Sequence, residues 1–328
     1  MIFSFIAILC LVEFIFVIAN GQQEQVGPSH HATPLGQVAT NNNFATTAFA
    51  STSQTIEYLD LSVEKEPAEI MASEQNKEYF NKQAASYDSK HEKTLNRVLE
   101  EIRARLDFIG VDWASDEDSD ESDADDEKKG APAAPAVAAL KKQVRLLDYA
   151  CGTGLVSRAL APYTTQCVGI DLSENMVDAY NTRAENQGLT EDEMHAYQGN
   201  LCVPSDPNPE TLAAPVFFNF DIAAVGLGFH HFDDPALAAQ RLVERLNPGG
   251  VLLVLDFLAH DKLHHSHHEA SHTVTHHGFS EEEIKKMFID AGAGKDFALQ
   301  SVGVVFNFKA DDHEGTKRQI FLARGTKA

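Results

Sequence analysis

A glycine-containing turn between an apolar segment and a helix-like segment constrains this chain more than any other feature. Residues 144–147 are mostly apolar, Asp148 ends the run, and Gly152 and Gly154 flank a small residue just before a helix-like stretch at 155–160. Two glycines around a small residue allow the backbone of a strand-to-helix turn to pass close to a bound ligand. The pattern therefore predicts a strand, a ligand-binding turn and a helix of a parallel α/β sheet.

An acidic residue ends the next apolar segment. Residues 167–170 are apolar and are followed by Asp171. An acid at the tip of the second strand accepts hydrogen bonds from both hydroxyls of a ribose. Ser173 is a suitable N-cap for a helix that continues to Arg183. The turn and the acid together predict a nucleoside site on a parallel sheet.

Charge indicates which nucleoside is bound. A dinucleotide-binding turn reads Gly-x-Gly-x-x-Gly, but Ala150 and Leu155 stand where its outer glycines are expected. Asp148 would repel a diphosphate and suits a ligand that carries an ammonium and a sulfonium. These residues resemble the first motif of the class I S-adenosylmethionine (SAM)-dependent methyltransferases, and Asp171 resembles their second. Two alternatives stay open: a structural turn without a ligand, and the nucleotide site of an oxidoreductase.

The later segments follow in the order that this family has. Between two strand-like segments stand His-His-Phe-x-Asp-Pro, at residues 230–235, and Leu-x-Pro-Gly-Gly, at residues 246–250. From about residue 76 onward the chain resembles the small-molecule branch, which includes ubiquinone and menaquinone biosynthetic methyltransferases. The resemblance implies an α/β, doubly wound, Rossmann-like fold with a seven-stranded, mostly parallel sheet and an antiparallel edge hairpin. The later strands are expected at residues 195–199, 220–227, 251–257, 297–308 and 318–324.

The resemblance also implies SAM as the cofactor and a set of residues that bind it. The first motif would shape the methionine end of the site, and Asp171 would hold the ribose. Met176 and Asn200 would flank the adenine. The full expected set is Asp148, Ala150, Gly152, Thr153, Gly154, Asp171, Leu172, Met176, Asn200 and Leu201.

Four residues are candidates for a place near the transferred methyl group. Tyr87 lies in a helix-like segment, residues 77–105, that resembles the N-terminal lid of the small-molecule branch. His230 follows the fourth strand, at the expected mouth of the site, and a structural role is the alternative for it. His276 and His277 resemble part of a loop that closes over the substrate pocket in some relatives. Histidines act as general bases near neutral pH, which makes all three catalytic candidates.

The two histidines of that loop end a histidine-rich segment, residues 260–279. The spacing of its histidines is irregular and no cysteine lies nearby, so we expect no dedicated metal site and no required metal. Residues 264–268 are expected to be solvated. Only His276 and His277 are expected near the pocket.

Composition limits the partners. The net charge of −23 disfavours a general nucleic-acid binder, because phosphates are neutralised by clustered Lys and Arg. Residues 116–127 are almost all acidic, repel one another and bury nothing, so they predict a disordered insertion. A solvated spacer is the simplest role for it, and docking of a protein partner is the alternative. The four cysteines lack Cys-x-x-Cys spacing and are expected to be reduced thiols.

The first residues allow several interpretations. Residues 1–19 are strongly apolar, which is typical of a signal peptide or a short membrane anchor, but no Lys or Arg precedes Lys65. Because family-like sequence begins just after Met71, we expect the working protein to start there and to be cytoplasmic. The expected organisation is an N-terminal segment (1–70), a helical lid (71–110), an acidic insertion (111–140) and the SAM-binding domain (141–328).

These patterns predict a methyltransferase that transfers the methyl group of SAM to an oxygen, nitrogen or carbon of a small molecule. The alternative is a regulatory, methyltransferase-like protein that acts through a protein partner or methylates protein. The acceptor itself leaves no signature in the sequence.

Overall fold

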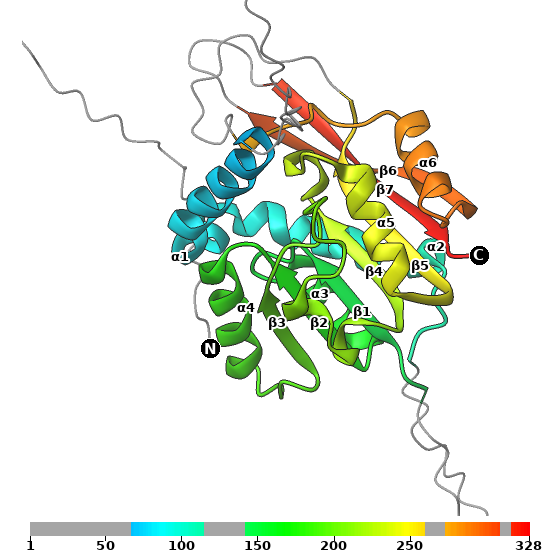
Figure 1. Cartoon of the computed structure of the whole chain (residues 1–328), viewed down its shortest axis with the longest axis horizontal. Helices are drawn as coiled ribbons and strands as arrows, with labels where there is room; N and C mark the ends of the chain where they lie inside the picture. The colour runs from blue at the N-terminus through cyan, green and yellow to red at the C-terminus, as the bar shows by residue number, and fades with distance from the viewer. Residues whose placement is uncertain (1–66, 115–141, 260–272, 309–315) are drawn as a thin grey trace, which may run out of the picture. The chain divides into compact units, whose positions relative to one another are not determined.

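Seven strands form one sheet in the order β3-β2-β1-β4-β5-β7-β6, which can be followed in Figure 1 from β3 at one edge to the β6–β7 hairpin at the other. β7 is antiparallel to both of its neighbours, and the remaining pairs are parallel. This confirms the predicted doubly wound α/β fold with an antiparallel edge hairpin. The strands are β1 Arg145–Tyr149, β2 Gln166–Asp171, β3 Met194–Gln198, β4 Phe220–Gly226, β5 Leu246–Phe257, β6 Lys295–Phe308 and β7 Thr316–Thr326.

The structure is a computed structural model that describes residues 67–114, 142–259, 273–308 and 316–328, all within the compact unit Ser62–Ala328. Residues 1–66, most of the acidic insertion and the histidines at 264–268 lie outside the described residues. What the sequence predicts for those segments therefore stays a prediction. Among the helices that are described, none has both the length and the apolar character needed to cross a bilayer.

Helices cover both faces of the sheet. Neighbouring strand residues point to opposite faces, and because both sets of side chains are apolar, each face must be buried. Leu146 packs in the cluster that contains side chains of α1, α3 and α4, whereas Leu147 packs in the cluster of α5 and α6. Both side chains are fully buried. The helices are α1 Pro67–Arg103, α2 Leu106–Ile109, α3 Leu155–Leu160, α4 Glu174–Asn186, α5 Pro235–Arg245 and α6 Glu281–Asp290. Short 3-10 turns lie at η1 Ala161–Tyr163, η2 Glu210–Leu212, η3 Pro215–Phe217 and η4 Phe229–His231.

The helix starts follow from local capping chemistry. The hydroxyl of Ser173 accepts a hydrogen bond from the backbone nitrogen of Met176, at 3.1 Å, which confirms the predicted cap of α4. α6 was not expected from the sequence, although Ser280 and Glu283 form a capping box that marks its start. α1 is longer than the predicted helix at residues 77–105, and it continues through Met71 without a break.

The strand order places a crevice at the carboxyl ends of β1 and β4. From β1 the chain moves outward to β2 and β3, then returns to place β4 on the other side of β1. In open α/β sheets, the loops diverge at such a reversal and leave room for a ligand. The segments that follow β1, β2 and β4 are therefore the ones expected to build a site.

Candidate functional site

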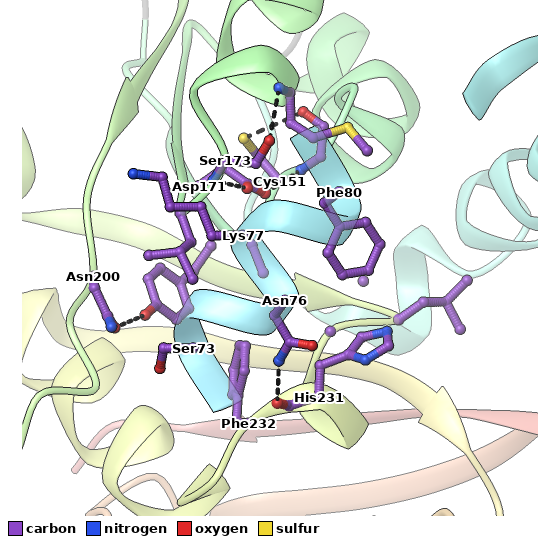
Figure 2. Close-up of a pocket in the computed structure, with 18 of the residues that line it drawn as sticks. Ser73, Asn76, Lys77, Phe80, Cys151, Asp171, Ser173, Asn200, His231 and Phe232 are labelled. Carbon is purple, nitrogen blue, oxygen red and sulfur yellow. Dashed lines mark hydrogen bonds between the residues drawn. The ribbon is translucent and has the colours of Figure 1, made fainter. Parts of the chain in front are cut away.

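A cavity lies at the carboxyl ends of β1, β2 and β4, and α1 crosses it with Ser73, Asn76, Lys77 and Phe80 (Figure 2). About 1150 Å³ of empty space lies within it when the open solvent at its mouth is included. The candidates that line it are Tyr87, Ala150, Gly152, Thr153, Asp171, Leu172, Met176 and Asn200. The candidates that do not line it are Asp148, Gly154, Leu201, His230, His276 and His277.

The carboxylate of Asp171 is fixed at the base of the cavity by two backbone groups. The backbone nitrogen of Gly152 donates to its Oδ2 at 2.8 Å, and that of Ser173 donates to its Oδ1 at 2.8 Å. Each oxygen therefore keeps a lone pair for a ligand hydroxyl. Burial raises the pKa of Asp171, although the backbone hydrogen bonds oppose this. Gly152 has φ of +51°, and a Cβ added there would meet no atom within 4 Å, so the turn leaves open space beside the carboxylate.

Asp148 and Gly154 shape the turn from beneath instead of facing the cavity. Asp148 is 1% exposed, and its Oδ2 accepts hydrogen bonds from the backbone nitrogen and the hydroxyl of Ser157, at 2.9 and 2.7 Å. Burial raises its pKa to about 7. Gly154 has φ of +90°, and an added Cβ would lie 2.9 Å from a ring carbon of Tyr180. The two residues therefore hold the start of α3 against the turn.

Asn200 and Met176 lie at another part of the cavity wall, beyond β2 and β3. The Oδ1 atom of Asn200 accepts from the backbone nitrogen of Cys202 at 2.8 Å and from the hydroxyl of Tyr149 at 3.3 Å. Since a backbone nitrogen can only donate, these bonds fix the orientation of the amide and leave its nitrogen to donate elsewhere. Leu201 is buried, and its backbone nitrogen donates to the same tyrosine hydroxyl at 3.1 Å.

Polar contacts attach α1 to the turn and to α4. Asp88 on α1 forms an ion pair with Arg183 and accepts a hydrogen bond from the hydroxyl of Thr153 at 2.6 Å. Asn81 accepts a hydrogen bond from Ser173. Tyr87 lines the cavity, and burial raises its pKa to about 12, so its hydroxyl stays protonated at neutral pH. A protonated phenol donates a hydrogen bond and is not a general base.

The adjacent histidines after β4 face different surroundings. His230 is buried, and its Nδ1 lies 2.8 Å from Oδ1 of Asp256, at the end of β5. Its backbone oxygen accepts from the backbone nitrogen of His276 at 3.0 Å. The ring of His276 packs against Phe279 with centroids 5.4 Å apart, away from the cavity lining. His230 and His276 therefore lie behind the cavity wall.

His231, which was not a candidate, lines the cavity instead. Its Nδ1 lies 2.7 Å from the carbonyl oxygen of Thr273, and its ring lies 4.0 Å from that of His230 and 5.2 Å from that of Phe80, between centroids. Burial lowers the pKa of His231 to about 3, so the imidazole is neutral at physiological pH. Its backbone oxygen accepts from Nδ2 of Asn76 at 3.0 Å.

Two non-glycine residues of the lining have left-handed backbone conformations. Ala150 has φ of 53° and Leu227 has φ of 61°. Such conformations cost free energy for residues with a Cβ and are concentrated at functional sites. Their position at the ends of β1 and β4 is consistent with a ligand site.

Apart from Tyr87, the sequence did not point to the lining residues that α1 and the segment after β4 contribute. The rule that ligands bind at strand ends points to every residue after β4, but it does not say which side chains face inward. The other lining residues of α1 carry no such signal. The missed lining residues include Ser73, Asn76, Lys77, Phe80, Leu227, His231, Phe232, Asp233 and Asp234.

The lining residues fit an adenosyl cofactor. Asp171 offers two free lone pairs for ribose hydroxyls, and the amide of Asn200 offers a donor for a base. Asp171, Asp233 and Asp234 give the lining a negative character that suits a cationic ligand. Across the described part of the chain, no three His, Cys, Asp or Glu residues are grouped so that they could hold a metal ion.

An open, doubly wound sheet with an acidic cavity at its switch point is typical of Rossmann-like proteins. The family described as "Methyltransferase domain" matches residues 123–294, just over half of the 328 residues. The chain belongs to this family.

The comparisons with individual proteins agree with the family. An uncharacterized methyltransferase of Schizosaccharomyces pombe is 35% identical over 156 residues, which cover 46% of this chain and 54% of the relative. A ubiquinone biosynthesis O-methyltransferase of Leptothrix cholodnii is 29% identical over 107 residues, or 33% of this chain and 41% of the relative. The chain thus spans about half the length, or less, of these curated relatives.

A solved structure extends the likeness in fold. It is the complex of the Haloferax volcanii Trm112 methyltransferase activator with a methyltransferase, at a TM-score of 0.50 and 18% identity. The match covers 75% of this chain and 96% of that one. At this identity, the likeness concerns the fold alone.

Proposed function

We propose that this chain is a SAM-dependent methyltransferase that acts on an oxygen, nitrogen or carbon nucleophile of a small molecule. The observation that carries the proposal is the Asp171 carboxylate, which Gly152 and Ser173 hold at the base of the cavity with two lone pairs left over. This arrangement matches the two vicinal hydroxyls of a ribose. It lies at the strand ends where the family match and the fold both favour a nucleoside.

When bound, SAM would supply an electrophilic methyl group on its sulfonium for a lone pair of the acceptor. The residues of this chain bind and orient the two reactants. Asp171 would accept the ribose hydroxyls, and Met176 and Asn200 would lie beside the adenine. The turn at Ala150 and Gly152 would lie along the methionine part.

The position of α1 supports a small acceptor. α1 crosses the cavity and is tied to the turn and α4 through Asp88, Thr153 and Arg183. A cavity that a helix covers admits a small molecule more readily than a surface of a folded protein, and the cover excludes water from the reacting groups. We also propose that the enzyme acts in the cytoplasm, where SAM is supplied.

Binding of three ligands tests the function. Isothermal titration and melting curves would be recorded for the full chain with SAM, S-adenosylhomocysteine and NAD. We expect SAM and S-adenosylhomocysteine to bind and to raise the melting temperature, because ligands that bind only the folded state stabilise it. NAD should have no effect. Binding of NAD without SAM would identify an oxidoreductase, and binding of none would refute the cofactor site.

A further inference from the structure

We propose that the half of the cavity beneath α1 binds the methyl acceptor as a non-anionic, largely apolar molecule whose reacting group shares one hydrogen-bond donor between Asn76 Oδ1 and His231 Nε2. The inference rests on the proposed function, because it names the acceptor class for that same site. The inference depends on the orientation of the Asn76 and His231 side chains, on the apolar residues of the cavity lining and on the charged residues of that lining.

Asn76 presents an oxygen that lacks a donor. Its Nδ2 donates to the backbone oxygen of His231 at 3.0 Å. A carbonyl oxygen can only accept, so this bond fixes which end of the amide faces His231. The other end, Oδ1, is buried and has no hydrogen-bond partner among the described residues, although the residue lines the cavity. A buried acceptor without a donor is unfavourable, and a ligand hydroxyl or amine placed there would satisfy it.

His231 presents a second acceptor. Its Nδ1 lies 2.7 Å from the carbonyl oxygen of Thr273, which can only accept, so Nδ1 carries the hydrogen of the neutral ring. Nε2 is then the nitrogen with the free lone pair. The ring is held between Phe80 and His230, with centroids 5.2 and 4.0 Å away, so its orientation is fixed before a ligand binds.

Apolar side chains from the same two elements as these acceptors line the cavity. Phe80 and Leu95 come from α1, and Leu227 and Phe232 come from the segment after β4. Burial of an aromatic or aliphatic body against them would supply most of the binding free energy, and the two acceptors would select the reacting group.

The charges around the cavity disfavour an anionic acceptor. Lys77 is the one Lys or Arg among the described residues that line it, and its Nζ lies 3.3 Å from Oε2 of Glu174. Asp233 and Asp234 add negative charge to the lining. An acceptor that carries a carboxylate or phosphate would meet like charges and no unpaired cation there.

Three probes with the same body test this assignment. p-Cresol has a neutral donor, 4-methylanisole has the same ring without a donor, and p-toluate is an anion. Their dissociation constants would be measured by titration of the full chain saturated with S-adenosylhomocysteine. We expect p-cresol to bind about tenfold more tightly than either of the others, the scale of one satisfied hydrogen bond.

Variants show whether the two named atoms cause the preference. Asn76→Leu and His231→Phe should each remove most of the tenfold difference between p-cresol and 4-methylanisole. Asn81→Leu is the matched control, because Asn81 also lies on α1 and ties it to α4, through Ser173 and Asn175, but does not line the cavity. The preference should survive in this control. Melting curves show whether each variant is folded.

The outcomes separate the two proposals. Failure of S-adenosylhomocysteine to bind refutes the proposed function. If it binds but the wild-type chain binds the three probes equally, binds none of them, or prefers p-toluate, the acceptor assignment is wrong while the cofactor site stands. A p-cresol preference that persists in folded Asn76→Leu and His231→Phe chains also overturns the assignment.

Discussion

The two halves of the cavity are built in different ways. In the cofactor half, the hydrogen bond between Gly152 and Asp171 joins residues only 19 positions apart, at the tips of neighbouring strands. In the acceptor half, the bond between Asn76 and His231 joins residues 155 positions apart, one on α1 and one after β4. The first half is a product of one β-turn-α-β unit, whereas the second exists only when α1 is docked.

This difference has consequences for stability and for specificity. The cofactor half inherits the rigidity of the sheet, because its polar groups follow directly from buried strands. The acceptor half depends on polar contacts of α1 that involve partly exposed groups, such as Asp88 and Arg183 with 29% and 28% exposed side chains. Changes in the cofactor half should therefore affect folding and SAM binding strongly. Changes to the α1 contacts should act weakly and mainly on ligand exchange.

The largest expected effect is the pH dependence that Asp148 confers on stability. Burial raises its pKa from 3.8 to about 7, so the folded chain holds the proton more tightly than the unfolded chain. This stabilisation is complete below about pH 4 and is lost as the pH rises through about 7. A pKa difference of about 3 corresponds to about 4 kcal/mol. Asp148→Asn, which mimics the protonated acid, should gain stability relative to wild type as the pH rises from 5 to 8.

Denaturant unfolding at several pH values measures this difference. Asp178→Asn serves as the control, because Asp178 is exposed on α4. A stability difference between wild type and Asp148→Asn that stays constant from pH 5 to 8 would show that the buried carboxyl does not have the raised pKa.

The next effect concerns the rigid turn itself. Gly154→Ala should lower the free energy of unfolding by roughly 2–4 kcal/mol. Alanine is strained in the left-handed backbone conformation of this position, and its Cβ would also clash with the ring of Tyr180. Gly188→Ala is a matched control with φ of +76° but no atom within 4 Å of the added Cβ, so only the strain remains. Urea unfolding of both variants gives the comparison. Equal losses would mean that the packing of Tyr180 under the turn is not as described.

The third effect separates cofactor binding from acceptor binding. Asp171→Ala should weaken SAM binding by about 1–3 kcal/mol, because two ligand hydroxyls lose their partner. The p-cresol preference should be retained at saturating S-adenosylhomocysteine, since Asp171 lies in the other half. Titration calorimetry measures both quantities. Unchanged SAM affinity in a folded Asp171→Ala chain would remove this residue from the site.

The smallest effect should come from the attachment of α1. Asp88→Asn replaces the ion pair with Arg183 by a weaker contact, and the pair is partly exposed, so the expected loss is about 0.5–1 kcal/mol. Dissociation of SAM should become a few-fold faster while overall stability changes little. Stopped-flow displacement by S-adenosylhomocysteine measures the rate. Lys82→Gln, which removes an exposed pair within α1, is the control and should leave the rate unchanged.

The same contrast explains what the sequence reveals. The turn at Gly152, the acid at Asp171 and the cap at Ser173 could be predicted because each is encoded within a few residues of a strand end. The neighbouring histidines could not be distinguished. They follow one another in η4, and only the tertiary partners, Asp256 for His230 and Thr273 for His231, decide which of them lines the cavity.

Two other misses have different causes. α6 carries a readable signal, because Ser280 and Glu283 match the capping-box pattern, and a search for that pattern would have found it. Asn76 carries none. Its amide faces the cavity only because α1 crosses the strand ends, and helical periodicity alone does not specify what a helix packs against.

A crystal structure of the full chain with S-adenosylhomocysteine tests the central claim most directly. We predict that both ribose hydroxyls lie within hydrogen-bond distance of the Asp171 carboxylate, with the sulfur directed toward the half of the cavity that contains Asn76 and His231. A nucleoside bound outside this cavity, or one whose ribose lies away from Asp171, would contradict it.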